Sequence, residues 1–129
     1  MTFQISAVTL GVKDLQVSKS FYEGIGATVE KEYPNFISLT LAEGSPILGL
    51  YPRDGLAEML GVSPKGSGFT GVKFDFNPAG QGKERVDELL SKVERTGGTI
   101  VKPAHEAEWG GRVGIFRDPD GNLWQVASY

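Results

Sequence analysis

The sequence predicts an α+β fold made of two modules, each with the order strand, helix, strand, strand, strand. This order occurs first in residues 1–62 and again in residues 68–129. Both helices end at a similar junction, Gly26–Lys31 in the first module and Gly98–Lys102 in the second. The polar segment between the modules contains Gly and Pro, which are typical of links. We therefore predict one domain over residues 1–129, divided into two modules.

In the first module, hydrophobic periodicity separates the strands from a helix. Val8, Leu10 and Val12 alternate along the first strand. Apolar residues then recur at three- and four-residue spacing, as in an amphipathic helix, after Asp14 at a good N-cap position. The expected strands are Gln4–Val12, Ala27–Glu32, Phe36–Leu41 and Pro46–Tyr51, and the expected helices are Leu15–Gly24 and Arg53–Gly61.

The second module repeats this order and ends in a hairpin. Val86, Leu89, Leu90 and Val93 form a helical stripe. In the final turn, the Asp118 carboxylate is expected to accept hydrogen bonds from nearby backbone, and Gly121 permits a left-handed conformation. The expected elements are the strand Thr70–Phe76, a helix over about Gly82–Thr96, and the strands Thr99–Lys102, Val113–Phe116 and Leu123–Ala127.

Composition excludes several classes of protein. Hydrophobic residues make up 40% of the 129 residues, enough for a packed core and too many for disorder. The net charge of −3, without a basic stripe, argues against nucleic acid. No apolar run is long enough to cross a membrane, and Met1–Gln4 does not begin a signal peptide. The absence of cysteine excludes disulfides and thiolate metal sites and agrees with a cytoplasmic location.

Polar residues in two strands are the first candidates for a ligand-binding site. Gln125 lies between Trp124 and Val126, so alternation turns its amide to the opposite face of the sheet. Lys73 and Asp75 alternate with apolar residues in the same way. These three side chains would face a ligand in a cleft. Alternatively, the charged pair is simply solvated and Gln125 is a buried amide bonded to backbone.

Aromatic side chains and the only histidine supply further candidates. Trp109 precedes two glycines, and its indole could stack on a planar ligand, or could form a lid or a subunit contact. His105 could act as a base or a ligand contact, or could be a polar loop residue before a strand. The full set of candidate ligand-binding residues is Lys73, Asp75, Trp109, Gln125, Thr9, Phe36, Tyr51 and His105.

With these residues in view, the chain resembles the vicinal oxygen chelate superfamily, which includes glyoxalase I, bleomycin-resistance proteins and extradiol dioxygenases. The resemblance lies in Val8–Leu15, Ser18–Tyr22, Trp109–Gly111 and, most specifically, Phe116–Trp124. It implies two βαβββ modules whose curved sheets enclose a shared cleft, usually within a homodimer.

Many enzymes of this superfamily hold a divalent metal with His and Glu ligands. The resemblance places the four ligand positions at Ala7, Gly71, Gln125 and near Gly49. Ala7, Gly71 and Gly49 have no side-chain atom that could bind a metal. The neutral amide of Gln125 is a poorer ligand for a divalent cation than a carboxylate. We therefore expect no metal site and no cofactor.

The leading functional hypothesis is a metal-free protein that binds a small organic molecule in the cleft, for instance by sequestration. One alternative is an enzyme of glyoxalase or dioxygenase type. It would depend on a metal, or it would use acid–base chemistry at Lys73, Asp75 or His105. Another is a protein whose cleft has lost its function and whose dimer surface matters instead. Whether the chain is an enzyme is left open, because one scaffold supports many functions.

Overall fold

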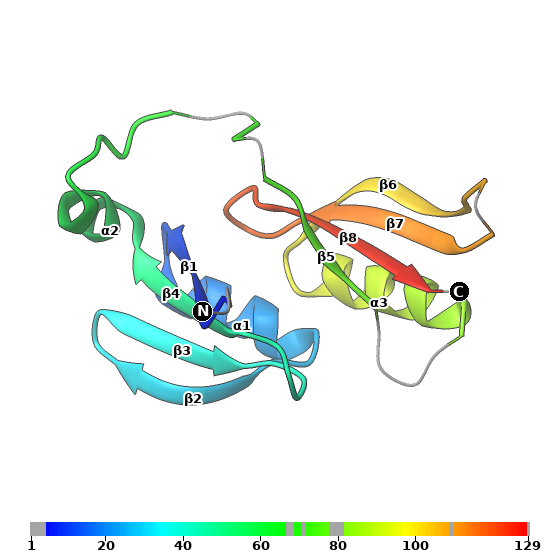
Figure 1. Ribbon diagram of the computed structural model, residues 1–129, viewed down its shortest axis with the longest axis horizontal. Helices are drawn as coiled ribbons and strands as arrows, with labels where there is room; N and C mark the ends of the chain where they lie inside the picture. The colour runs from blue at the N-terminus through cyan, green and yellow to red at the C-terminus, as the bar shows by residue number, and fades with distance from the viewer. Residues whose placement is uncertain (1–4, 67–68, 71, 78–81, 109, 129) are drawn as a thin grey trace, which may run out of the picture. The chain divides into compact units, whose positions relative to one another are not determined.

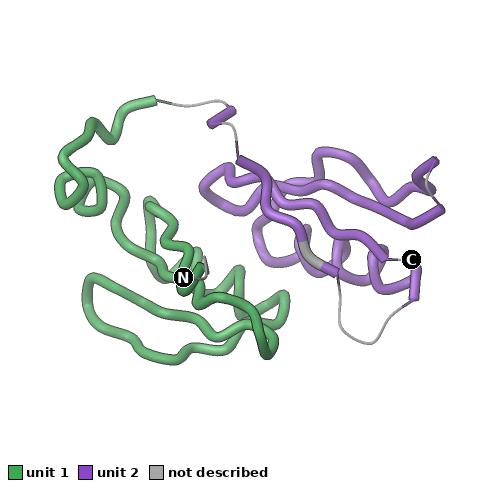
Figure 2. The backbone as a smooth tube through the Cα atoms, viewed as in Figure 1, with its two compact units in different colours: residues 1–67 green, residues 68–129 purple. Residues whose placement is uncertain are grey.

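The chain forms two compact units, residues 1–67 (unit 1) and residues 68–129 (unit 2), each with its own sheet (Figures 1 and 2). The computed structural model describes residues 5–66, 69–70, 72–77, 82–108 and 110–128. Each unit has the order strand, helix and three strands, and unit 1 adds a second helix. This arrangement confirms the predicted α+β fold of two βαβββ modules.

Unit 1 is a four-stranded sheet in the order β1-β4-β3-β2. The strand β1 runs parallel to β4, and the other pairs are antiparallel. Apolar residues at alternate positions, including Leu10, Ile37 and Leu50, form the buried face that packs against α1. The elements are β1 (Ala7–Val12), α1 (Leu15–Gly24), β2 (Thr28–Tyr33), β3 (Phe36–Thr40), β4 (Ile47–Pro52) and α2 (Arg53–Leu60).

The helix α1 begins where the sequence predicted. The Asp14 side chain accepts hydrogen bonds from the backbone N–H groups of Gln16 and Val17, at 2.9 and 3.1 Å. These two donors would otherwise lack helical partners. Phe21 and Tyr22 are 0% and 2% exposed, so this helix contributes the largest side chains of the core of unit 1.

Unit 2 is a four-stranded sheet in the order β5-β8-β7-β6, with α3 on one face (Figure 1). The strand β5 runs parallel to β8, and the remaining pairs are antiparallel. The helical stripe predicted from Val86 to Val93 is buried against the sheet. The elements are β5 (Phe74–Phe76), α3 (Glu84–Arg95), β6 (Thr99–Glu106), β7 (Arg112–Arg117) and β8 (Leu123–Ser128).

Two strands of unit 2 differ from the prediction by more than one residue at an end. The expected strand Thr70–Phe76 is paired only over Phe74–Phe76, where β8 supplies partners, and Val72 is 50% exposed instead of facing the helix. The expected strand Thr99–Lys102 continues to Glu106, because β7 provides partners along that length. The extension places His105 within a strand.

The described helices include none that is both long and apolar enough to span a membrane.

Candidate functional site

The face of the unit 2 sheet that lies opposite α3, here called the outer face, carries a row of residues across all four strands. The partners in register are Asp75 on β5, Gln125 on β8, Ile115 on β7 and Lys102 on β6. The residues that alternate with them, such as Phe116 and Trp124, are buried on the helix side of the sheet. The outer face therefore combines polar and apolar side chains.

The predicted residues Lys73, Asp75 and Gln125 are brought together at one end of this row. The Lys73 ammonium donates to the Gln125 Oε1 at 3.2 Å and lies 3.1 Å from the Asp75 carboxylate. The Lys73 and Asp75 side chains are 46% and 57% exposed, so solvent weakens this ion pair. Gln125 itself is half-buried.

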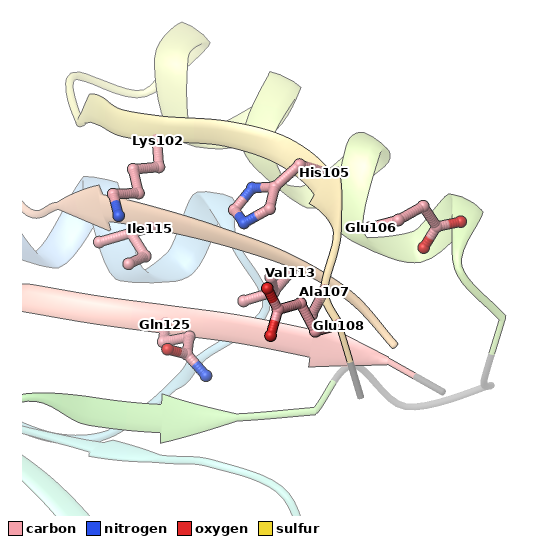
Figure 3. Close-up of a pocket in the computed structure, with 8 residues that line it drawn as sticks. All are labelled: Lys102, His105, Glu106, Ala107, Glu108, Val113, Ile115 and Gln125. Atoms are coloured by element: carbon pink, nitrogen blue, oxygen red, sulfur yellow. The ribbon is translucent and has the colours of Figure 1, made fainter. Parts of the chain in front are cut away.

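Beside Gln125 the outer face is hollowed, with a volume of about 380 Å³ (Figure 3). Buried Val113 and half-buried Ile115 supply its apolar floor, and polar side chains surround them. The complete lining is Lys102, His105, Glu106, Ala107, Glu108, Val113, Ile115 and Gln125. The hollow is large enough for a small organic molecule and belongs entirely to unit 2.

The orientation of His105 is fixed by the backbone of its own strand. Its Nδ1 lies 2.9 Å from the Pro103 carbonyl oxygen, which can only accept, so Nδ1 carries the proton in this contact. In the neutral imidazole, Nε2 is then an acceptor. His105 lines the hollow, and Figure 3 shows its ring on the same side of the sheet as Gln125. The imidazole can therefore accept a hydrogen bond or a proton from a molecule there.

Unit 1 carries the other predicted candidates on the corresponding face of its own sheet. Phe36 and Tyr51 form a tilted ring pair with centroids 6.2 Å apart. A side-chain carbon added at Gly49 would lie 3.0 Å from the Thr9 hydroxyl and 3.2 Å from the Phe36 ring. Thr9 is in register with Gly49. The absence of a side chain at Gly49 thus leaves room for an aromatic ring on this face.

The residues present do not fit a divalent metal site. Ala7 and Gly49 lie on β1 and β4 and have no donor side chain, and Gly71 lies outside the described residues. The Gln125 oxygen is neutral and already accepts a hydrogen bond from the cationic Lys73. No group of three or more His, Cys, Asp or Glu residues within the described parts of the chain could hold a metal ion.

Six residues of the lining were not singled out from the sequence, namely Lys102, Glu106, Ala107, Glu108, Val113 and Ile115. Ile115 could have been found from the sequence, because counting equal numbers of residues outward from the hairpin turn along both strands places it opposite Gln125. Irregularities between Ile100 and Lys102, and again before His105, interrupt the simple alternation of β6. Trp109, which was predicted to lie near the ligand, is outside the described residues.

Arg112 adjoins this region in sequence but pairs with the helix. Its guanidinium forms two hydrogen bonds with the Asp87 carboxylate on α3, at 2.7 and 2.9 Å. The hydrogen bonds between the two side chains are the main cause of a pKa shift in each. They hold the pKa of the Asp87 carboxyl below its usual value, and they raise the pKa of the Arg112 guanidinium. Arg112 therefore links β7 to α3.

Comparisons with known proteins agree with this architecture. The family model described as the Glyoxalase/Bleomycin resistance protein/Dioxygenase superfamily matches residues 4–126. A search of curated proteins found no match. Among solved structures, a glyoxalase-related enzyme from Fulvimarina pelagi is 29% identical, with a TM-score of 0.83 over 96% of this chain and 86% of that one.

Two further solved structures share the fold at lower identity. A glyoxalase/bleomycin resistance protein/dioxygenase family enzyme from Burkholderia phytofirmans PsJN is 21% identical, with a TM-score of 0.82 over 95% of each chain. A lactoylglutathione lyase from Agrobacterium tumefaciens is 18% identical, with a TM-score of 0.67 over 96% of this chain and 92% of that one. The match of the family model over nearly the whole sequence shows that this chain belongs to the glyoxalase/bleomycin resistance protein/dioxygenase superfamily.

Proposed function

We propose that this chain is a metal-free member of its superfamily that binds a small organic molecule, for instance to sequester it. The observation that carries the proposal is the hollow beside Gln125, where an apolar floor at Val113 and Ile115 is ringed by polar groups. Such a combination is typical of small-molecule sites, because apolar contact supplies affinity and a few polar groups fix orientation. Binding by this mechanism requires neither a nucleophile nor a metal.

The partners and the location belong to the same proposal. We expect a homodimer, as the family resemblance implies, in the cytoplasm, with no nucleic acid or membrane partner. Separately from the hollow, the Phe36–Tyr51 pair on unit 1 offers an aromatic surface that suits contact with a planar molecule.

The proposal is tested by a screen of small organic molecules against isotopically labelled protein, with amide chemical shifts as the readout. We expect hits to shift the signals of Gln125 and Ile115, and Ile115→Arg to abolish binding by filling the hollow. The matched control is Glu94→Arg on α3, which packs on the opposite face of the sheet, and this variant should bind normally. Equal binding by Ile115→Arg and the native protein would contradict the proposed site.

The metal-free part of the proposal has a separate test. Protein purified without chelators or metal-affinity resin is examined by elemental analysis, and we expect no stoichiometric divalent metal. A metal present at one equivalent would contradict this part and would favour a metal-dependent lyase or dioxygenase.

A second candidate function, proton transfer on a bound molecule, is favoured by the geometry of His105. The bond from Nδ1 to the Pro103 carbonyl leaves Nε2 as an acceptor in an imidazole that lines the hollow. If His105 acts as a base, solvent deuterium should exchange into a bound carbonyl compound at the carbon next to the carbonyl. His105→Gln should abolish this exchange, whereas exchange at an unchanged rate in that variant would exclude the role.

A further inference from the structure

The polar groups of the unit 2 hollow are segregated, with hydrogen-bond donors at one end. Lys102 and Gln125 belong to the same row, because both pair in register with Ile115. The Gln125 Oε1 accepts from Lys73 at 3.2 Å, which orients the amide and leaves its NH₂ group free to donate to a ligand. Lys102 supplies an ammonium group, and Figure 3 shows it extending from β6 toward Ile115. This end of the hollow suits an anion.

Acceptors gather toward the other end of the hollow. His105 is in register with Val113, and its Nε2 is an acceptor when the imidazole is neutral. Glu108 follows the end of β6, and Figure 3 shows its carboxylate beside Val113. This end suits an N–H donor, and above all a cation.

Among the described residues that line the hollow, one cationic and one anionic side chain have no partner of opposite charge. Of the charged side chains that line the hollow, the Glu106 carboxylate is already paired, because it lies 3.2 Å from the ammonium of Lys83. Within the part of the chain that the structure describes, Lys102 and Glu108 have neither a hydrogen bond nor an ion pair from their side chains. The hollow therefore offers two opposite charges that remain to be matched by a ligand.

The spacing of these two charges follows from the sheet register. Lys102 pairs with Ile115, whereas the residue before Glu108 bonds to the Gly111 carbonyl at 2.8 Å. The two partners on the opposite segment, Ile115 and Gly111, are four residues apart, which corresponds to about 13 Å along an extended strand. The Glu108 carboxylate lies beside Val113, which shortens this span (Figure 3). Val113 lies between the two ends, so the intervening surface is apolar.

We propose that the hollow binds an elongated zwitterion. The carboxylate of the ligand lies at Lys102 and Gln125, its ammonium group lies at Glu108 and His105, and a short apolar body covers Ile115 and Val113. This inference rests on the proposed ligand-binding function and specifies the chemical class of the ligand. Neither a neutral molecule nor a singly charged one matches both ends.

The test uses four probes with the same carbon chain, namely ε-aminocaproate, caproate, hexylammonium and hexanol. Their affinities are measured by titration of isotopically labelled protein, following the amide signals of the hollow. An exposed ion pair contributes little on its own, so each matched charge should strengthen binding about two- to fivefold. We expect the zwitterion to bind about tenfold more tightly than hexanol, with both singly charged probes between them.

Variants then assign each charge to one end. Lys102→Gln should weaken zwitterion binding about two- to fivefold and remove the preference for caproate over hexanol. Glu108→Gln should weaken zwitterion binding by a similar factor and remove the preference for hexylammonium over hexanol. The matched controls are Lys92→Gln and Glu94→Gln on α3, which make the same charge changes on the opposite side of the sheet and should leave all four affinities unchanged.

A charge exchange provides the sharpest check. Lys102→Glu and Glu108→Lys should each impair zwitterion binding, and the double variant should recover most of it because the ligand can bind in reverse. Equal affinity for hexanol and ε-aminocaproate would overturn the proposal that the ligand is a zwitterion and would leave the proposed binding function intact. If none of the four probes shifts the signals of the hollow, the zwitterion is also overturned, and the wider screen then decides the proposed function separately.

Discussion

At the scale of single residues, Asp118 organises the turn between β7 and β8. Asp118 is only 3% exposed. One carboxylate oxygen accepts hydrogen bonds from the backbone N–H groups of Asp120 and Asn122, at 2.9 and 2.8 Å. The other accepts from the Asn122 side chain at 2.8 Å. The turn thereby holds β8, and with it Gln125, in register with β7.

Asp118→Ala should lower the free energy of unfolding by about 1–3 kcal/mol, because three partly buried donor groups would lose their acceptor. Urea denaturation measures the change. The control is Ser38→Ala, since the Ser38 hydroxyl is buried and has no hydrogen-bond partner in the described structure. That change should be neutral or stabilising. Equal destabilisation by both variants would show that the Asp118 contacts do not account for its effect.

At the scale of elements, α3 approaches β7 through a glycine. A side-chain carbon built on Gly114 would lie 2.5 Å from the Leu90 Cδ1 and 3.3 Å from its Cγ. Both residues are buried. A side chain at this position of the strand would therefore force the buried Leu90 side chain to move.

Gly114→Ala should therefore destabilise the fold by about 1–3 kcal/mol through overpacking. Leu90→Val removes the group that clashes, so the double variant should lose less stability than the sum of the single changes. Thermal and urea unfolding of the four proteins complete the cycle, with Ser91→Ala on the exposed side of α3 as control. Strict additivity would contradict direct contact between these residues.

A second contact between the same elements depends on pH. The pKa of Asp87 is lowered from its ordinary value of 3.8, chiefly by hydrogen bonds from Arg112. Because this pKa is lowered in the folded state, the Asp87–Arg112 ion pair contributes its full stabilisation above pH 3.8. That stabilisation is lost as the pH falls through the pKa of Asp87 in the folded state. The Asp87 side chain is 51% exposed, so this contribution is small and screened by salt.

Asp87→Asn should accordingly be slightly less stable than the native protein at neutral pH, and the difference should vanish in acid. Urea denaturation of both proteins across this pH range provides the measurement. A difference that stays constant or grows in acid would exclude the ion pair as its source. Repeating the neutral measurement at high salt should reduce the difference.

At the scale of the whole molecule, the family resemblance assigns metal-ligand positions to both units, and the residues at these positions can be compared with what a metal needs. Ala7 lies on unit 1 and Gln125 on unit 2, and neither supplies a charged ligand. The space above Gly49 is taken by the Phe36 ring and the Thr9 hydroxyl. An aromatic ring therefore lies at the Gly49 position of unit 1, and a hydrogen bond from Lys73 engages the Gln125 oxygen of unit 2.

The sequence by itself determined the order of elements, because local signals control it. Alternation and helical spacing located the strands and helices, Asp14 capped α1, and the Asp118 turn fixed the final hairpin. The same alternation turned Gln125 away from Trp124. The short pairing of β5 and the extension of β6 were missed, because a strand ends where its neighbour stops supplying partners.

Only the tertiary structure decided which side chains meet. Lys102 and Glu108 line one hollow although irregular pairing breaks the period of β6 between them. Arg112 turns to an aspartate 25 positions earlier in the chain. Contacts of this kind depend on register and packing between distant segments, and these are set by the summed fit of the whole sheet, which no local pattern encodes.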